Sequence, residues 1–208
     1  GTISMDSHAH VTGISSIADK VPNAGEQVWD DTGAVTHGGT ADGVMDLGAD
    51  DTLGYAISAS GFTFTAGLSL PADGAEKSAT IVADGLVDGL SVGVGIGNNQ
   101  NAATDDNVET YFVKYAAGPI TVGAQKSALD AETVNTDVER TAYGVSFAVS
   151  ENLSVSYGIS DTSYDAKTSD EENDGVSASY TAGGMTLGLV HNKKDNTNGT
   201  SGNSHEVT

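Results

Sequence analysis

The sequence of 208 residues has no cysteine, three prolines and only 8 basic residues against 29 acidic ones. The absence of cysteine excludes a disulfide framework, a cysteine-ligated zinc site and a thiol nucleophile. A formal net charge of −21 leaves no basic face to displace counterions from phosphates, which excludes a general nucleic-acid-binding protein. No apolar run reaches the length of about 18 residues that a transmembrane helix needs. Membrane β-strands need only about ten residues of alternating character, so the sequence does not exclude a membrane β-barrel.

What the chain does contain is a period of two, the pattern of β-strands, from about residue 52 onward. The stretches that show it most clearly are 62–70, 90–97, 142–149, 153–160 and 185–189. One face of each predicted strand is aliphatic and aromatic, and the other is Gly, Ser, Thr and Ala. A soluble sandwich usually carries charged side chains on its outer face. We therefore expect the small polar face to line a wide lumen and the apolar face to contact lipid.

The predicted connections alternate between tight turns and long polar loops, as in an up-and-down barrel whose two rims differ. Tight turns are expected at 60–61, 85–89, 117–119, 150–152 and 182–184, and long loops at 71–76, 98–106, 128–137, 162–173 and 193–203. Acidic residues gather at the rim with the long loops: Asp105, Asp106, Asp130, Glu132, Asp137, Asp161, Asp165, Asp170, Glu171, Glu172 and Asp174. Tyrosines on the apolar face, several of them near strand ends, fit an aromatic girdle at the membrane interface.

The first fifty residues differ from the rest. A short strand over residues 1–7 leads into a polar, glycine-rich and mostly aperiodic segment, residues 8–49, in which Ile14, Ile17 and Val21 predict one short helix before Pro22. A structureless loop of this length is uncommon in a compact domain and is normally functional.

The ordered combination of segments resembles the general diffusion porins of alphaproteobacteria, the Rhodobacter-type porins and their marine relatives. Residues 1–6 (GTISMD) are similar to a family strand that runs into an inward-folded constriction loop. Residues 17–22 (IADKVP) and 26–31 (EQVWDD) resemble that loop, and 56–67 (AISASGFTFTAG) resemble the next hairpin.

The resemblance implies an all-β, antiparallel up-and-down transmembrane β-barrel of about 16 strands in the bacterial outer membrane. The chain would cover strands 5 to 15 and the start of 16, as one partial barrel domain over residues 1–208. Residues 8–49 would form the constriction loop and 50–208 the meander. Strands are expected near 52–60, 62–70, 77–84, 90–97, 107–116, 120–127, 138–149, 153–161, 174–181 and 185–192, with a last one starting at Ser204. The family also implies a homotrimer in contact with outer-membrane lipid and lipopolysaccharide.

Few charged residues are predicted to face the lumen. Strand parity turns Lys114 and Arg140 inward, where a water-filled pore would hydrate them. Acidic residues of the long loop are candidates for the opposite side of the constriction: Asp19, Glu26, Asp30 and Asp31. The alternatives are that Arg140 pairs with an acidic loop at the rim and that the acids are solvated loop charges.

Carboxylate clusters offer the hard oxygen ligands that Ca²⁺ or Mg²⁺ prefers. They are Asp105 with Asp106, and Asp170 with Glu171 and Glu172; the alternative is solvated charge without an ordered ion. His8 and His10 have a metal-ligand spacing but lack the further ligands of an α/β-barrel enzyme, so polar loop histidines are the favoured interpretation.

The functional prediction is a passive outer-membrane channel for small hydrophilic solutes and ions, weakly cation-selective, with no required cofactor and no enzymatic reaction. No coherent catalytic set is present in the sequence. The alternative is a secreted acidic β-solenoid, an adhesin or passenger domain, which would have parallel strands in a fixed coil repeat.

Overall fold

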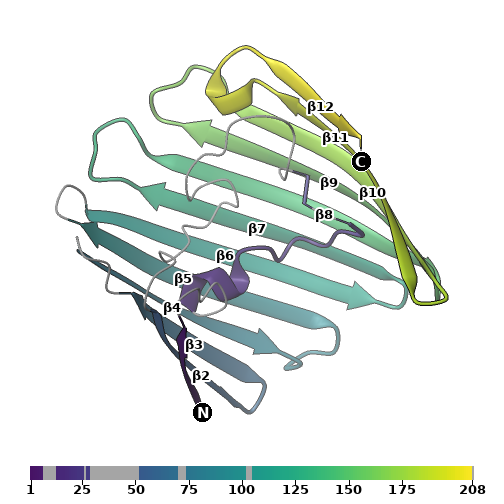
Figure 1. Cartoon of the computed structure of the whole chain (residues 1–208), viewed down its shortest axis with the longest axis horizontal. Helices are drawn as coiled ribbons and strands as arrows, with labels where there is room; N and C mark the ends of the chain where they lie inside the picture. The colour runs from purple at the N-terminus through teal and green to yellow at the C-terminus, as the bar shows by residue number, and fades with distance from the viewer. Residues whose placement is uncertain (7–12, 26, 29–51, 70–73, 102–104, 208) are drawn as a thin grey trace.

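The computed structural model describes residues 1–6, 13–25, 27–28, 52–69, 74–101 and 105–207. Its strands form one 12-stranded sheet in which every strand pairs with its neighbour in sequence (Figure 1). The strands are Thr2–Asp6 (β1), Thr52–Ala59 (β2), Phe62–Ser69 (β3), Gly74–Asp84 (β4), Leu90–Asn101 (β5), Asp105–Ala117 (β6), Ile120–Asp130 (β7), Val138–Ser150 (β8), Leu153–Tyr164 (β9), Glu171–Ala182 (β10), Met185–Asp195 (β11) and Asn203–Val207 (β12). Two 3-10 helices accompany them, Gly13–Ile17 (η1) and Thr197–Gly199 (η2).

All the strand pairs are antiparallel. The predicted all-β up-and-down meander is therefore confirmed, and the number of strands matches the expected run from the fifth to the start of the sixteenth. The β-solenoid alternative is wrong, because it requires parallel strands. Within the described ranges, no helix is long and apolar enough to cross a membrane.

Tight turns join the strands at one rim, at the positions that the sequence predicts. Ser60 and Gly61 close the β2–β3 hairpin with φ angles of 53° and 80°, and Gly183 and Gly184 close β10–β11 with 57° and 82°. These left-handed conformations are the ones that two-residue hairpin turns need, and glycine adopts them without steric cost.

At the opposite rim the strands are longer than the sequence predicts. β4 begins at Gly74 rather than 77, β7 ends at Asp130 rather than 127, and β10 begins at Glu171 rather than 174. The apolar alternation stops at the expected places, but backbone pairing continues through the polar residues beyond it. Acidic residues that were expected in loops, such as Asp130 and Glu172, therefore lie in strands.

The two faces of the sheet differ as the alternation predicts. We call the face that carries Thr65, Ser78, Thr110, Gln125 and Ser160 the inner face; these side chains are buried. The outer face carries exposed apolar residues on every long strand, including Phe64, Ile81, Ile96, Val113, Val122, Tyr143, Val145, Tyr157, Val176 and Leu187. Ile96 and Leu187 are each 61% exposed, which is the opposite of a soluble fold with its apolar side chains in a closed core.

Residues 13–25 and 27–28, which we call the inner segment, lie across the inner face (Figure 1). The segment begins with a single 3-10 turn, η1, and its side chains Ile14, Ile17, Val21 and Val28 are buried. Val21 and Val28 pack with Ala142 of β8, and Ile14 packs with Val108 of β6. The most buried apolar contacts of the described chain thus lie between the inner segment and the sheet.

Glycines of the sheet make room for this segment. Gly123, Gly144, Gly158 and Gly175 are successive register partners on β7, β8, β9 and β10, and we call them the glycine row. A Cβ on Gly123 would lie 2.7 Å from Pro22 Cδ, one on Gly144 2.6 Å from the Pro22 carbonyl oxygen, and one on Gly158 2.8 Å from Val28 Cγ1. The expectation that small inward residues only clear the lumen is incomplete, because here they admit the chain's own segment.

Replacing Gly144 with valine is expected to displace the inner segment, because the new side chain occupies the space of Val21 and Pro22. Overpacking of this kind costs about 1–3 kcal/mol, which raises the open population roughly 5- to 150-fold. The measurement is the rate of trypsin cleavage after Lys20, which is half-buried. Gly188→Val is the matched control, since Gly188 has nothing within 4 Å of its Cβ position; equal cleavage of the two variants would contradict the packing role of the row.

Candidate functional site

Gln125 of β7 holds the middle of the inner segment through its side-chain amide. Its Nε2 donates to the carbonyl oxygens of Ile17 at 2.9 Å and Ala18 at 2.7 Å, and its Oε1 accepts from the Lys20 backbone N–H at 2.9 Å. The residue is only 5% exposed. Because the inner segment has no strand partner here, this one side chain supplies the hydrogen bonds that its backbone would otherwise lack.

Hydroxyl groups of the sheet hold the first turn of the segment. The Ile14 backbone N–H donates to Ser78 Oγ at 2.8 Å. Thr65 Oγ1 donates to the Gly13 carbonyl oxygen at 3.2 Å and lies 2.6 Å from Thr80 Oγ1. The sequence shows these small side chains only as part of a polar face. In the structure they form hydrogen bonds with the backbone of the inner segment.

The far end of the segment is held in the same way by β9, β10 and β11. The Ala24 N–H donates to Ser156 Oγ at 2.9 Å, and Ser177 Oγ lies 3.3 Å from the same nitrogen. Asn192, which is 1% exposed, donates to the Gln27 carbonyl oxygen at 3.5 Å. The inner segment is therefore attached to the sheet at points from β3 to β11.

Two lysines, Lys20 of the inner segment and Lys114 of β6, lie near each other on the inner face. Lys114 of β6 points inward, as predicted, since its partner Ser91 shares the parity of the inward Gly93 and Gly95. Burial, and next the nearby Lys114, lower the pKa of Lys20 below its ordinary value, while Asp19 and Asp84 act in the opposite direction. Asp19 itself is exposed; Glu26, Asp30 and Asp31, the other predicted constriction acids, lie outside the described residues.

Arg140 of β8 also points inward and is 7% exposed. Its Nε donates to Thr162 Oγ1 at 3.0 Å. On β10, Glu171 is 2% exposed, lies 3.5 Å from Lys194 Nζ and accepts a hydrogen bond from the Asn198 backbone N–H at 2.8 Å. Lys194 thus pairs with a buried carboxylate, and the same carboxylate holds η2 through the Asn198 N–H.

The predicted metal ligands are spread over both faces. Glu171 points inward and Glu172 outward, as neighbours on one strand must. Asp105 accepts a hydrogen bond from Asn98, and Asp106 accepts one from the Glu132 backbone N–H. Over the ranges given above, no group of three or more His, Asp or Glu side chains could hold a metal ion. The divalent-cation site stays a prediction.

Sequence reasoning missed Gln125 and Lys20. Gln125 is an uncharged residue on a predicted inner face of Gly, Ser and Thr. Its length was the available signal, because a long amide among short side chains can reach the backbone of a segment that lies over the sheet. Lys20 lies in a segment without periodicity. Neither the direction of its side chain nor its proximity to Lys114 could therefore be predicted from the sequence.

Gln125→Leu is expected to release the middle of the inner segment, because it removes the partners of Ile17, Ala18 and Lys20. Each lost hydrogen bond costs about 0.5–1.5 kcal/mol, so exchange of the Lys20 amide should quicken by roughly tenfold or more. Hydrogen exchange measured residue by residue tests this. The Ile14 amide, held by Ser78, is the internal reference, and Gln125→Glu, which keeps the acceptor for Lys20, should give a smaller effect. Unchanged Lys20 exchange in the leucine variant would refute the assignment.

No protein-family model matches the chain, and no curated protein is similar to it in sequence. Solved structures do share its fold. A porin structure superimposes with a TM-score of 0.64 at 19% identity, covering 93% of this chain and 71% of the porin. The outer-membrane expressed OmpT of Vibrio cholerae superimposes with a TM-score of 0.56 at 15% identity, covering 75% of this chain and 61% of OmpT. Taken with the antiparallel meander and its inverted faces, these likenesses show that the chain has a porin-type β-barrel fold.

Proposed function

We propose that the protein is an outer-membrane porin, a passive diffusion channel for small hydrophilic solutes and ions that catalyses no reaction. The observation that carries this function is the inverted sheet, with exposed apolar side chains outside and small polar ones inside. An apolar band on the outside suits lipid, and a polar inner face suits water. The likeness to a porin and to an outer-membrane protein supports the proposal.

The inner segment is the proposed constriction. It lies on the polar face with its apolar side chains turned toward the sheet, so its other side is left to face the lumen. Lys20, Asp19, Lys114 and Arg140 are the described side chains that we assign to this region, with Glu26, Asp30 and Asp31 on the remainder of the loop. A narrow point lined by both signs of charge gives a transverse field across the path of a solute.

The finer family assignment is also a proposal. We propose that the protein is of the alphaproteobacterial type, assembles as a homotrimer with one pore in each protomer, and contacts outer-membrane lipid and lipopolysaccharide. Ca²⁺ or Mg²⁺ at the acidic rim would reduce repulsion between that rim and anionic lipid. The quoted motifs at 1–6, 17–22 and 56–67 support this assignment.

Selectivity is expected to be weakly in favour of cations, and the arrangement of the faces gives the reason. Strand acids at the loop rim face mostly outward: Asp105, Glu109, Asp130, Glu139, Asp161, Glu172, Asp174 and Asp195. Their field is screened over about 8 Å at physiological salt. The formal net charge of −21 therefore overstates the acidity of the lumen, where Lys114, Arg140 and Lys194 offset inward acids.

Channel formation is tested in planar lipid bilayers, where the protein should give stepwise currents. Deleting residues 14–31 should enlarge each step, because it removes the proposed constriction. Conductance that does not change on deletion would put the constriction elsewhere, and the absence of any steps from folded protein would refute the channel.

Lys114→Gln should increase the preference for cations. One unit charge at about 10 Å in water is worth about 0.4 kcal/mol, or roughly a factor of two for each ion, so the cation-to-anion permeability ratio should rise roughly two- to fourfold. The measurement is the reversal potential in a tenfold KCl gradient. Lys126→Gln is the matched control, because Lys126 faces outward on the adjacent strand and pairs with Glu139 at 2.9 Å. An equal shift in both variants would mean that the lumen does not set selectivity.

A further inference from the structure

Two lysines of the inner face have no carboxylate bound to them. Lys20 belongs to the inner segment and Lys114 to β6, and both residues are half-buried. Within the part of the chain that the structure describes, neither of them makes a salt bridge. Lys126, Lys193 and Lys194, by contrast, each pair with an acidic side chain. The two inner-face ammonium groups are therefore available to a ligand.

Backbone contacts fix where these two lysines lie relative to each other. The Lys20 backbone N–H donates to Gln125 Oε1 of β7 at 2.9 Å. Two residues further along the inner segment, Pro22 lies against Gly123, whose Cβ position is 2.7 Å from Pro22 Cδ. Gly123 is the register partner of Lys114. Lys114 therefore projects from the sheet beside the inner segment, and the lowered pKa of Lys20 agrees with this proximity.

A hydroxyl group lies next to the lysines. Ser91 of β5 is directly opposite Lys114 in the register, and it is half-buried on the inner face. Side chains that are opposite each other in an antiparallel pair have their Cβ atoms about 5 Å apart. The Ser91 hydroxyl and the Lys114 ammonium can therefore reach the same ligand. We call Lys20, Lys114 and Ser91 the lysine cluster.

Two acidic side chains, Asp19 and Asp84, act on the cluster from its surroundings. Each of them affects the pKa of Lys20 less than Lys114 does. Both are exposed, and exposed charges interact weakly because water screens them. Asp84 is the register partner of Ser91 on the side away from Lys114, which puts it two strand spacings, about 10 Å, from Lys114 across the sheet. The repulsion between the two lysines is therefore only partly offset by these carboxylates.

We propose that the lysine cluster binds a dianionic phosphate group, either free phosphate or the phosphate of a small monoester. Lysine ammonium groups are compact donors that bind phosphate oxygens as point charges. The two ammonium groups match the two negative charges of the ligand, and the Ser91 hydroxyl donates to a further oxygen. A singly charged anion such as acetate neutralises only one of the two lysines, so it binds less tightly.

The proposal deepens the proposed function, because it names a class of solute, and it rests on the inner face lining a lumen. Binding itself does not depend on conduction. Phosphate binding by a protein that passes no current would refute the channel alone. A conducting protein that does not prefer phosphate would refute this site alone.

The experiment is isothermal titration calorimetry of the folded protein in detergent at about pH 8, where a phosphate group is mostly a dianion. Inorganic phosphate, glycerol 3-phosphate and acetate are titrated separately at one ionic strength. The wild type should bind phosphate roughly tenfold more tightly than acetate, the effect of one additional charge at about 5 Å from two lysines in water. Binding of both phosphates assigns the site to the phosphate group in general, and binding of one alone assigns it to that source.

Lys20→Gln and Lys114→Gln should each weaken phosphate binding roughly tenfold, because each removes one charge at about 5 Å from a dianion. Lys114→Arg, which keeps the charge, should retain most of the affinity. Heat-dependent gel mobility confirms that each variant is folded.

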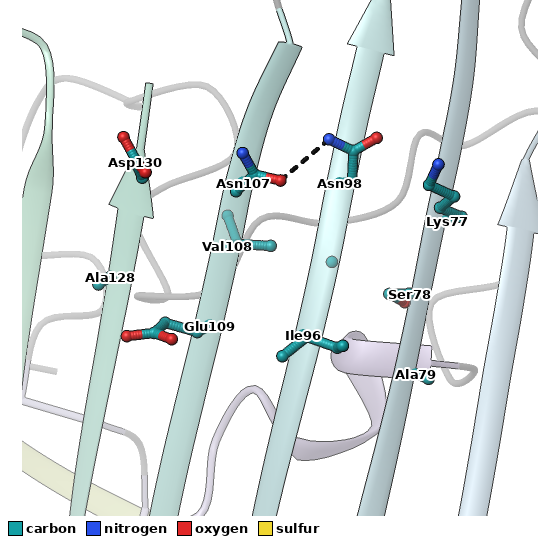
Figure 2. Close-up of a pocket in the computed structure, with 11 residues that line it drawn as sticks. Lys77, Ser78, Ala79, Ile96, Asn98, Asn107, Val108, Glu109, Ala128 and Asp130 are labelled. Carbon is teal, nitrogen blue, oxygen red and sulfur yellow. Dashed lines mark hydrogen bonds between the residues drawn. The ribbon is translucent and has the colours of Figure 1, made fainter. Parts of the chain in front are cut away.

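Lys77→Gln is the matched control. Lys77 likewise makes no salt bridge with a described residue, but it lies on the outer face, in a groove where Glu109 stands on the other side of Ile96 (Figure 2). This variant should bind phosphate like the wild type. Equal affinity of the wild type for phosphate and acetate would overturn the proposal. An equal loss in Lys77→Gln and Lys114→Gln would also overturn it, in favour of a general effect of net charge.

Discussion

The packing of the inner segment on the glycine row is the contact on which the rest of the inner face depends. A sheet surface of ordinary side chains would hold a second layer of chain about 10 Å away. The row lets Pro22 and Val28 of the segment approach the backbone of β7 and β9 directly. The hydroxyl and amide groups around it are then within hydrogen-bonding reach of its backbone, which has no strand of its own to pair with.

The two faces of the sheet are suited to two different environments, lipid outside and water inside. Its outer face replaces a protein core by lipid, so its stability there comes from apolar side chains that stay exposed in the isolated chain. Its inner face carries polar groups that are largely satisfied by one another, as with Thr110 and Ser127 at 2.7 Å. Among the described strands, most acids at the loop rim point outward, which separates their charge from the charge along the lumen.

Much of the fold was predictable, because a period of two is a local signal. The strands, their order, their outward residues and the tight turns all follow from alternation and from glycine at positive φ. The loop-rim ends of the strands did not follow, since pairing there continues through residues such as Asp130 and Glu171 that carry no apolar signal. The inward directions of Lys114 and Arg140 followed from parity. The roles of Gln125 and Gly144 did not, because they depend on a segment more than a hundred residues away.

That separation in sequence sets the order in which the structure can form. The inner segment follows β1 in the sequence and precedes all the strands that it contacts. Its hydrogen-bond partners lie 64 residues away at Ser78, 105 at Gln125 and 165 at Asn192. Hairpins that add one after another along the meander close only short loops, whereas the segment must wait until β11 is in place. Contacts of such long range form slowly. A segment that precedes almost all of its contacts in the sequence is therefore among the last parts to reach its final position, and the polar inner face stays open to water until then.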